Sequence, residues 1–111
     1  YNAVLKAQRK SFDTVSDGKS CHDVDSAGRD YLRNLDFAKY FVHGTGHGFG
    51  LEIHESPSIT FRSKDTLHTN MTITIEPGIY IPKKGGIRIE DDVLVNKDHA
   101  TTLTKAARNL F

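Results

Sequence analysis

The chain has 111 residues, 37% of them hydrophobic and 26% charged, which is typical of one modest globular domain and excludes a disordered segment. Fifteen Lys and Arg against fourteen Asp and Glu leave a net charge of +1, which argues against binding nucleic acid through bulk charge. The single cysteine, Cys21, excludes an internal disulfide, and no apolar run is long enough to span a bilayer.

The first third of the chain predicts two amphipathic helices. The first has apolar residues at helical spacing, and Gly18 supplies its C-terminal stop. Ser20, followed three residues later by Asp23, has the spacing of a capping box and predicts the start of the second helix. The apolar positions are Val4, Leu5, Phe12 and Val15 in the first helix, and Val24, Ala27, Tyr31, Leu32 and Leu35 in the second. Such helices need a partner layer, which the rest of the chain supplies as strands.

The remaining two thirds of the chain have the period of β-strands. The segment 43–50, HGTGHGFG, holds four glycines and cannot form a stable helix. Apolar and polar residues alternate in three segments, 49–54, 71–76 and 87–95, which predicts strands there. The polar stretch 56–70 predicts a loop, Pro77-Gly78 a break, and residues 82–86 a turn.

The alternation also sorts the residues that can carry chemistry. It directs the branched apolar residues to the face that packs on the helices. It places Glu76, Glu90 and His54 on the opposite face, while His43 and His47 lie in the glycine-rich segment. Carboxylate oxygens with an imidazole nitrogen suit Mn, Fe, Co or Zn. This pattern therefore predicts a metal site on one face of the sheet.

Each of these features also has an ordinary structural explanation. A carboxylate in the middle of a strand is common on the solvated face of an antiparallel sheet. Glycines around His43 and His47 are equally suited to a tight turn or to close backbone packing. Spacing alone leaves both interpretations open.

Three segments, in this order and at this spacing, resemble one family. They are HGTGHGFGLEIHE (43–55), TIEPGIYIP (74–82) and GGIRIEDDVLV (85–95). Together they resemble the pita-bread metallopeptidases, which include prolidase, aminopeptidase P and methionine aminopeptidase, and the run HGFGLEIHESP is most similar to the prolidase type. The resemblance implies an α+β pita-bread (creatinase/aminopeptidase-like) fold. Its C-terminal half, which this chain resembles, has two helices packed on a curved, mainly antiparallel sheet.

The resemblance also implies a role for each matching residue. His47 matches a metal ligand, Glu76 a ligand that also shuttles a proton, and Glu90 a carboxylate that bridges two metals. His43 and His54 match imidazoles that contact the substrate. Arg88 matches a cation beside the metal carboxylates.

One part of the family's site has no match. Two of its five ligands are aspartates on a hairpin that precedes the first helix, and none of Asp13, Asp17, Asp23, Asp25 and Asp30 matches them. The chain also begins with Tyr1 rather than Met. We therefore expect residues 1–111 to be a single partial catalytic domain that lacks the upstream hairpin, binds metal weakly or not at all, tends to associate and is inactive alone.

The function that the resemblance implies is that of a metal-dependent exopeptidase. It would cleave Xaa-Pro dipeptides or N-terminal Xaa-Pro bonds with a water activated by two divalent ions, manganese first, with cobalt, zinc or iron as alternatives. We expect a cytoplasmic protein whose partner is a peptide with proline in second position. A homo-oligomer is compatible with this expectation, and we expect binding to neither nucleic acid nor a membrane. Two alternatives are a creatinase-like, metal-independent amidinohydrolase and a non-catalytic pita-bread binding module. Retention of His47, Glu76 and Glu90 counts against both.

Overall fold

The computed structural model describes residues 1–110, which form the α+β arrangement that the sequence predicts. The helices are α1 (Asn2–Thr14), α2 (Cys21–Asn34) and the short 3-10 helix η1 (Ala38–Tyr40). The strands are β1 (Gly46–Gly48), β2 (Glu55–Ile59), β3 (Thr72–Ile75), β4 (Gly78–Ile81), β5 (Gly85–Arg88), β6 (Asp91–Val95) and β7 (Ala100–Thr102).

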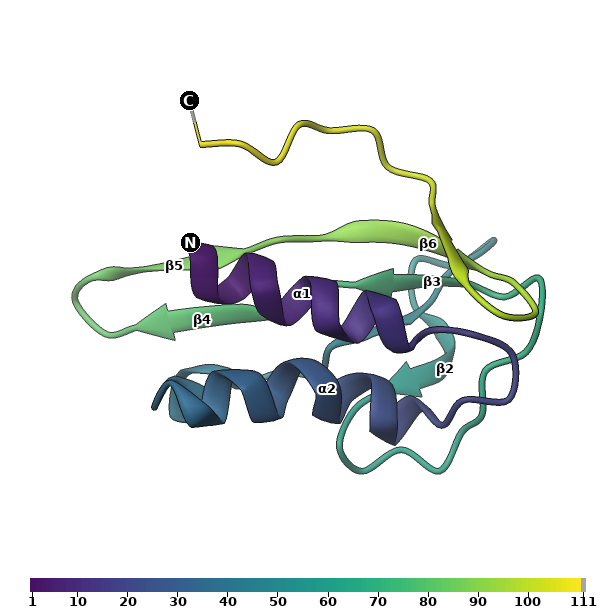
Figure 1. Cartoon of the computed structure of the whole chain (residues 1–111), viewed down its shortest axis with the longest axis horizontal. Helices are drawn as coiled ribbons and strands as arrows, with labels where there is room; N and C mark the ends of the chain where they lie inside the picture. The colour runs from purple at the N-terminus through teal and green to yellow at the C-terminus, as the bar shows by residue number, and fades with distance from the viewer. Residues whose placement is uncertain (111) are drawn as a thin grey trace.

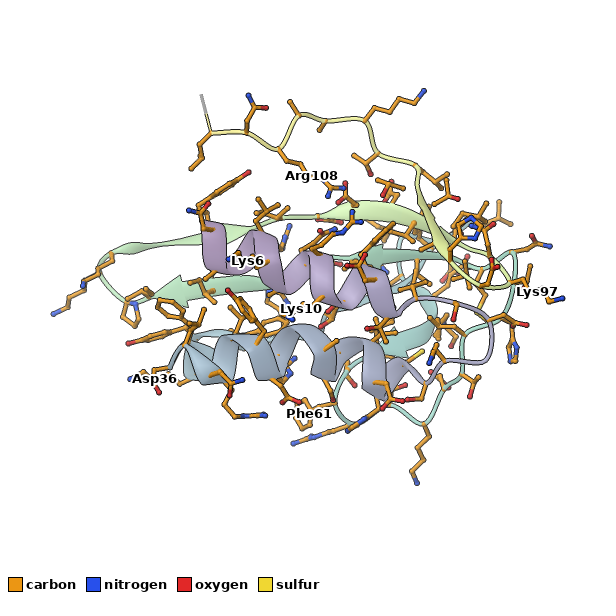
Figure 2. All side chains as sticks on the ribbon, viewed as in Figure 1. Lys6, Lys10, Asp36, Phe61, Lys97 and Arg108 are labelled. Carbon is orange, nitrogen blue, oxygen red and sulfur yellow. The ribbon has the colours of Figure 1, made fainter. Side chains whose placement is uncertain are left out.

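All strand pairs are antiparallel. Five strands form a sheet in the order β2-β1-β3-β6-β7, and β4 and β5 form a separate hairpin. Helices α1 and α2 lie side by side, and the hairpin extends the β3–β6 pair along them (Figure 1). The final segment returns over the sheet toward the start of α1, where the Tyr1 hydroxyl donates to the carbonyl of Arg108. Figure 2 shows Arg108 directed from this segment toward the sheet, where it pairs with Asp91.

The core consists of two apolar clusters. The larger one joins the C-terminal end of α1 and the start of α2 to the five-stranded sheet, and the smaller one joins both helices to η1 and the hairpin. The larger contains Val15, Cys21, Val24, Ile59, Leu67, Ile73, Ile75, Val93 and Val95, and the smaller Val4, Ala7, Leu32, Phe41 and Ile79. Neither long helix of the described chain has the length and apolarity needed to cross a membrane.

The predicted start of the second helix is confirmed, and its predicted apolar stripe is partly wrong. The hydroxyl of Ser20 accepts the backbone N–H of Asp23 at 3.0 Å, as expected of an N-cap. Leu35, predicted to belong to the stripe, is 42% exposed because the helix ends at Asn34.

Gly28 has a packing role that the sequence did not reveal. A Cβ on this residue would lie 2.5 Å from the hydroxyl of Ser11 and 2.9 Å from the carbonyl oxygen of Ala7. The absence of a side chain therefore lets α1 and α2 approach closely.

One strand prediction and one loop prediction were wrong. The alternating segment 49–54 forms no strand, and its apolar side chains Leu51 and Ile53 are 105% and 79% exposed. The segment predicted as a loop instead contains β2, which pairs with β1 at the edge of the sheet. Pro57 is tolerated in β2 because an edge strand has one side free of ladder hydrogen bonds.

Cys21 tests the packing between the start of α2 and the sheet. It is fully buried, and burial, followed by the charge of Asp65, raises the pKa of its thiol to about 11. Because the thiolate is the reactive form, labelling of the folded chain near pH 8 should be on the order of a hundredfold slower than in denaturant. The unfolded thiol loses its proton at lower pH than the folded one, so the free energy of unfolding should fall as pH rises above about 9. Equal labelling rates with and without denaturant would contradict this burial.

Gly28 tests the contact between the helices. Gly28→Ala should lower the free energy of unfolding by about 1–3 kcal/mol, because overpacking outweighs the gain in helix propensity. Ser11→Ala should relieve part of this loss in the double variant, since it removes one of the two clashing atoms. Ser26→Ala, elsewhere on α2, is the control, and chemical denaturation is the measurement. A stabilising Gly28→Ala would show that the helices can separate at no cost.

Candidate active site

Five of the six residues predicted to form a site line one cavity of about 570 Å³. His47 lies on β1, His54 just before β2 and Glu76 directly after β3, while Arg88 ends β5 and Glu90 precedes β6. The sixth, His43, lines an adjoining cavity of about 430 Å³, together with His47, His54, Glu76 and Arg88. The structure therefore brings all six predicted residues into one region.

Both carboxylates lie where a regular ladder is interrupted. The β3–β6 pairing ends at Ile75 and Asp91, and the β4–β5 hairpin begins beyond it at Gly78 and Arg88. Glu76 and Glu90 occupy the two sides of this interruption. Irregular strand positions of this kind commonly redirect side chains next to active sites.

Thr74 fixes the carboxylate of Glu76 against His47. Its hydroxyl donates to Oε1 of Glu76 at 2.8 Å and accepts the backbone N–H of His47 at 3.1 Å. The strands here are so close that a Cβ on Gly46 would lie 1.8 Å from the carbonyl oxygen of Thr74. Glycine is therefore required before His47 for β1 to reach β3.

The imidazole of His47 is held in one tautomer. Its Nδ1 lies 2.8 Å from the carbonyl oxygen of Gly48, to which it can only donate, so the neutral ring carries its lone pair on Nε2. That Nε2 lies 3.1 Å from Oε1 of Glu76. Two electron-rich atoms at this distance need a proton or a cation between them. A nitrogen and a carboxylate oxygen directed at one position fit a divalent metal ion, with the backbone carbonyl orienting the ligand as at many metal sites.

Arg88 supplies the positive charge beside the carboxylates. Its Nε lies 3.7 Å from Glu76 and 3.6 Å from Glu90. Burial, and then the charge of Glu76, raise the pKa of the Glu90 carboxyl despite the opposing effect of Arg88. Within residues 1–110, no group of three or more His, Cys, Asp or Glu side chains is arranged so that it could hold a metal ion.

The two remaining histidines border the space in front of His47. The ring of His54 lies 4.3 Å from that of His47, between centroids, and is exposed. His43 is held from both sides: its Nδ1 lies 2.8 Å from the carbonyl oxygen of Gly44, and its Nε2 lies 2.9 Å from the hydroxyl of Tyr80. A neutral His43 therefore accepts the proton of Tyr80, which orients its ring toward the cavity.

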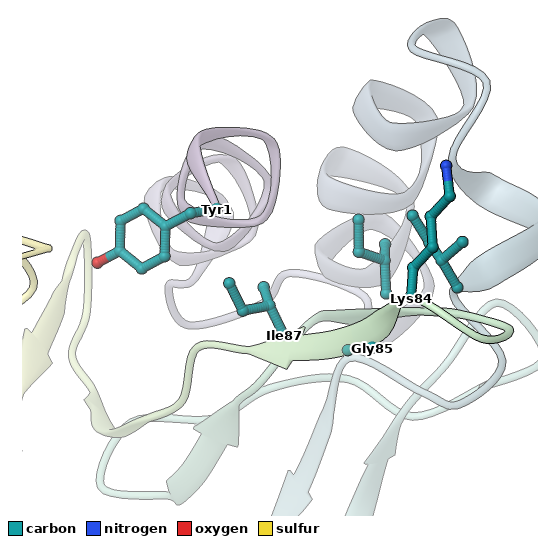
Figure 3. A pocket seen from close by; sticks show the side chains of 7 residues that line it. Tyr1, Lys84, Gly85 and Ile87 are labelled. Atoms are coloured by element: carbon teal, nitrogen blue, oxygen red, sulfur yellow. The ribbon is translucent and has the colours of Figure 1, made fainter.

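Another cavity is chemically different. It has about 270 Å³ and lies between the start of α1 and the β4–β5 hairpin, and in the view of Figure 3 Ile87 lies between Tyr1 and Lys84. Neither a carboxylate nor an imidazole lines it. This cavity therefore lacks the kinds of side chain that gather around His47 and Glu76.

Sequence reasoning missed the residues that support this site. Thr74 and Tyr80 show no signal beyond their place in the strand alternation. Asp25 and Arg29 have the i, i+4 spacing of a helical ion pair, but that spacing is also common on exposed helix faces. Their burial, which makes the pair unusual, is a property of the fold.

Known proteins share both the sequence and the structure of this chain. It is 46% identical over all of its 111 residues to the Xaa-Pro dipeptidase of Pyrococcus furiosus. The prolidase structure from Pyrococcus horikoshii OT3 matches 100% of the chain with 43% identity and a TM-score of 0.97. An X-Pro aminopeptidase structure from Thermotoga maritima MSB8 matches 99% of it with 39% identity and a TM-score of 0.95.

The chain corresponds to about a third of each of these proteins, 32% of the first two and 31% of the third. These matches confirm the pita-bread fold that the sequence motifs imply. The model of metallopeptidase family M24 matches residues 1–97, which include every predicted site residue. The chain therefore belongs to metallopeptidase family M24.

Proposed function

We propose that the chain forms part of a metal-dependent exopeptidase that hydrolyses Xaa-Pro dipeptides or N-terminal Xaa-Pro bonds. The observation that carries the proposal is the pair of His47 Nε2 and Glu76 Oε1, directed at one position 3.1 Å apart in the wall of a cavity. Family membership supports metal-dependent peptide hydrolysis. The names of the relatives, Xaa-Pro dipeptidase and prolidase, support the preference for proline.

In this proposal, His47, Glu76 and Glu90 would hold two divalent ions, of which manganese is the first candidate and cobalt, zinc and iron are alternatives. The ions would supply Lewis acidity to the scissile carbonyl and lower the pKa of a water nucleophile. Glu76 would also take the proton of that water, since its carboxylate is already fixed by Thr74. His54 would donate to the substrate as negative charge develops on it. His43 would do the same once its Nε2 carries a proton and the substrate takes the place of the Tyr80 hydroxyl.

Residues 1–111 would be a single partial catalytic domain, the C-terminal part of a pita-bread domain in a cytoplasmic protein. Three side chains cannot complete two metal sites, so two aspartates on an upstream hairpin would supply the rest. The extent of the match, about a third of each relative, supports this division.

The metal-binding part of the proposal can be tested on residues 1–111. Addition of Mn²⁺ should broaden the NMR signals of His47, Glu76 and Glu90 first, with weak affinity because ligands are missing. His47→Asn should abolish this broadening, and no Xaa-Pro dipeptide should be hydrolysed. His99→Asn, which changes an exposed histidine beside Asp98, is the matched control. Broadening that survives His47→Asn would exclude the metal site, and turnover by the chain alone would overturn the partial-domain interpretation.

The roles of His43 and His54 require the longer protein that we propose. Replacing either one by Ala should lower kcat for an Xaa-Pro dipeptide by about 10²–10³, the usual effect of removing one positioned donor. Metal content, measured by elemental analysis, should stay unchanged. His68→Ala, at an exposed histidine remote from the cavity, controls for nonspecific effects. Loss of metal in His54→Ala would make that residue a ligand instead.

A further inference from the structure

A buried ion pair on α2 faces the segment that leads to the candidate site. Asp25 is 0% exposed and Arg29 is 8% exposed. The guanidinium donates to both carboxylate oxygens, from Nε at 2.7 Å and from a terminal nitrogen at 2.9 Å. This bidentate arrangement gives both side chains a defined orientation.

The rest of the Arg29 guanidinium holds the chain before β1. Its two terminal nitrogens donate to the carbonyl oxygens of Phe41 at 3.0 Å and His43 at 2.8 Å. The same guanidinium lies over the ring of Phe41, 4.0 Å from its centroid. Arg29, which lies on α2, thus holds the backbone of His43 close to this helix.

Asp25 holds the next part of the same segment. Its Oδ1 accepts the hydroxyl of Thr45 at 2.8 Å and the backbone N–H of Thr45 at 3.2 Å. The carbonyl oxygen of Thr45 in turn accepts the backbone N–H of Glu76 at 2.7 Å. Thr45 also precedes His47 by two residues, so one buried carboxylate connects α2 to both members of the His47–Glu76 pair.

We propose that Asp25, Arg29 and Thr45 are positioning residues that set the geometry of His43, His47 and Glu76. This inference rests on the function proposed above. A buried ion pair is by itself weak support for stability, because desolvation offsets the attraction between its charges. Among the described residues, every hydrogen bond of these two side chains is made either within the pair or to the segment 41–45. The geometry therefore points to orientation of the site as its role.

The test compares Thr45→Val, Thr45→Ser and Arg29→Lys in residues 1–111 without metal. Thr45→Val removes the hydroxyl at nearly constant side-chain shape, whereas Thr45→Ser keeps the hydroxyl. Arg29→Lys keeps the positive charge but loses the bidentate hydrogen bonds of the guanidinium. The readouts are the imidazole ¹⁵N shifts of His43 and His47 and the amide signal of Glu76. Thr69→Val, at an exposed threonine, is the matched control.

We expect Thr45→Val to shift the signals of His47 and Glu76, Thr45→Ser to restore them, and Arg29→Lys to shift His43 most. A following Mn²⁺ titration should show about ten- to hundredfold weaker binding in Thr45→Val, the usual effect of losing support around a metal ligand. If Thr45→Val does not fold, Arg29→Lys still decides the question through the signal of His43.

Signals in Thr45→Val and Arg29→Lys that stay within the change caused by Thr69→Val would overturn the proposal. A different result would overturn the metal proposal alone: broadening by Mn²⁺ that survives His47→Asn, with the histidine signals still responding to Thr45→Val. The two proposals can therefore fail separately.

Discussion

Strand β3 supports both the core and the candidate site, because its two faces lie in different environments. Ile73 and Ile75 are fully buried among the apolar residues of the larger cluster. Thr74, and Glu76 directly after the strand, face the cavity instead. A slip of one residue in the pairing with β6 would bury the carboxylate and expose the isoleucines. The hydrophobic effect that selects the register therefore also selects where Glu76 points.

The sequence was informative where pattern and burial agree. The alternation in 71–76 identified β3, and Ser20 identified the start of α2, because each signal reflects a local physical requirement. The alternation in 49–54 was misleading, since Leu51 and Ile53 alternate with polar residues but find no core to cover them. β2 was missed because Pro57 and its polar neighbours resemble a loop, and only the fold shows that they occupy a sheet edge.

The candidate site could be predicted as a set of residues but not as an arrangement. Resemblance identified His47, Glu76 and Glu90, and the structure places them around one cavity. The groups that hold them differ in kind. Thr74 acts on Glu76 from two residues earlier in the chain, whereas Asp25 and Arg29 act from a helix remote in sequence. The sequence pattern cannot predict such support from a distant helix. An acidic and a basic residue four positions apart give the same pattern whether the folded chain buries them or exposes them to solvent.

The charges at the candidate site explain why two metal ions there would need acidic groups in addition to Glu76 and Glu90. Arg88 lies between Glu76 and Glu90, so the two carboxylates already share one positive charge. Two divalent ions would bring four more positive charges, which these two carboxylates cannot balance. Further anions must then come close to the cavity, and carboxylates are the side chains that combine negative charge with metal affinity. If the site holds the two divalent ions of the proposed function, the charge balance at Glu76 and Glu90 thus favours a site completed by additional acidic residues.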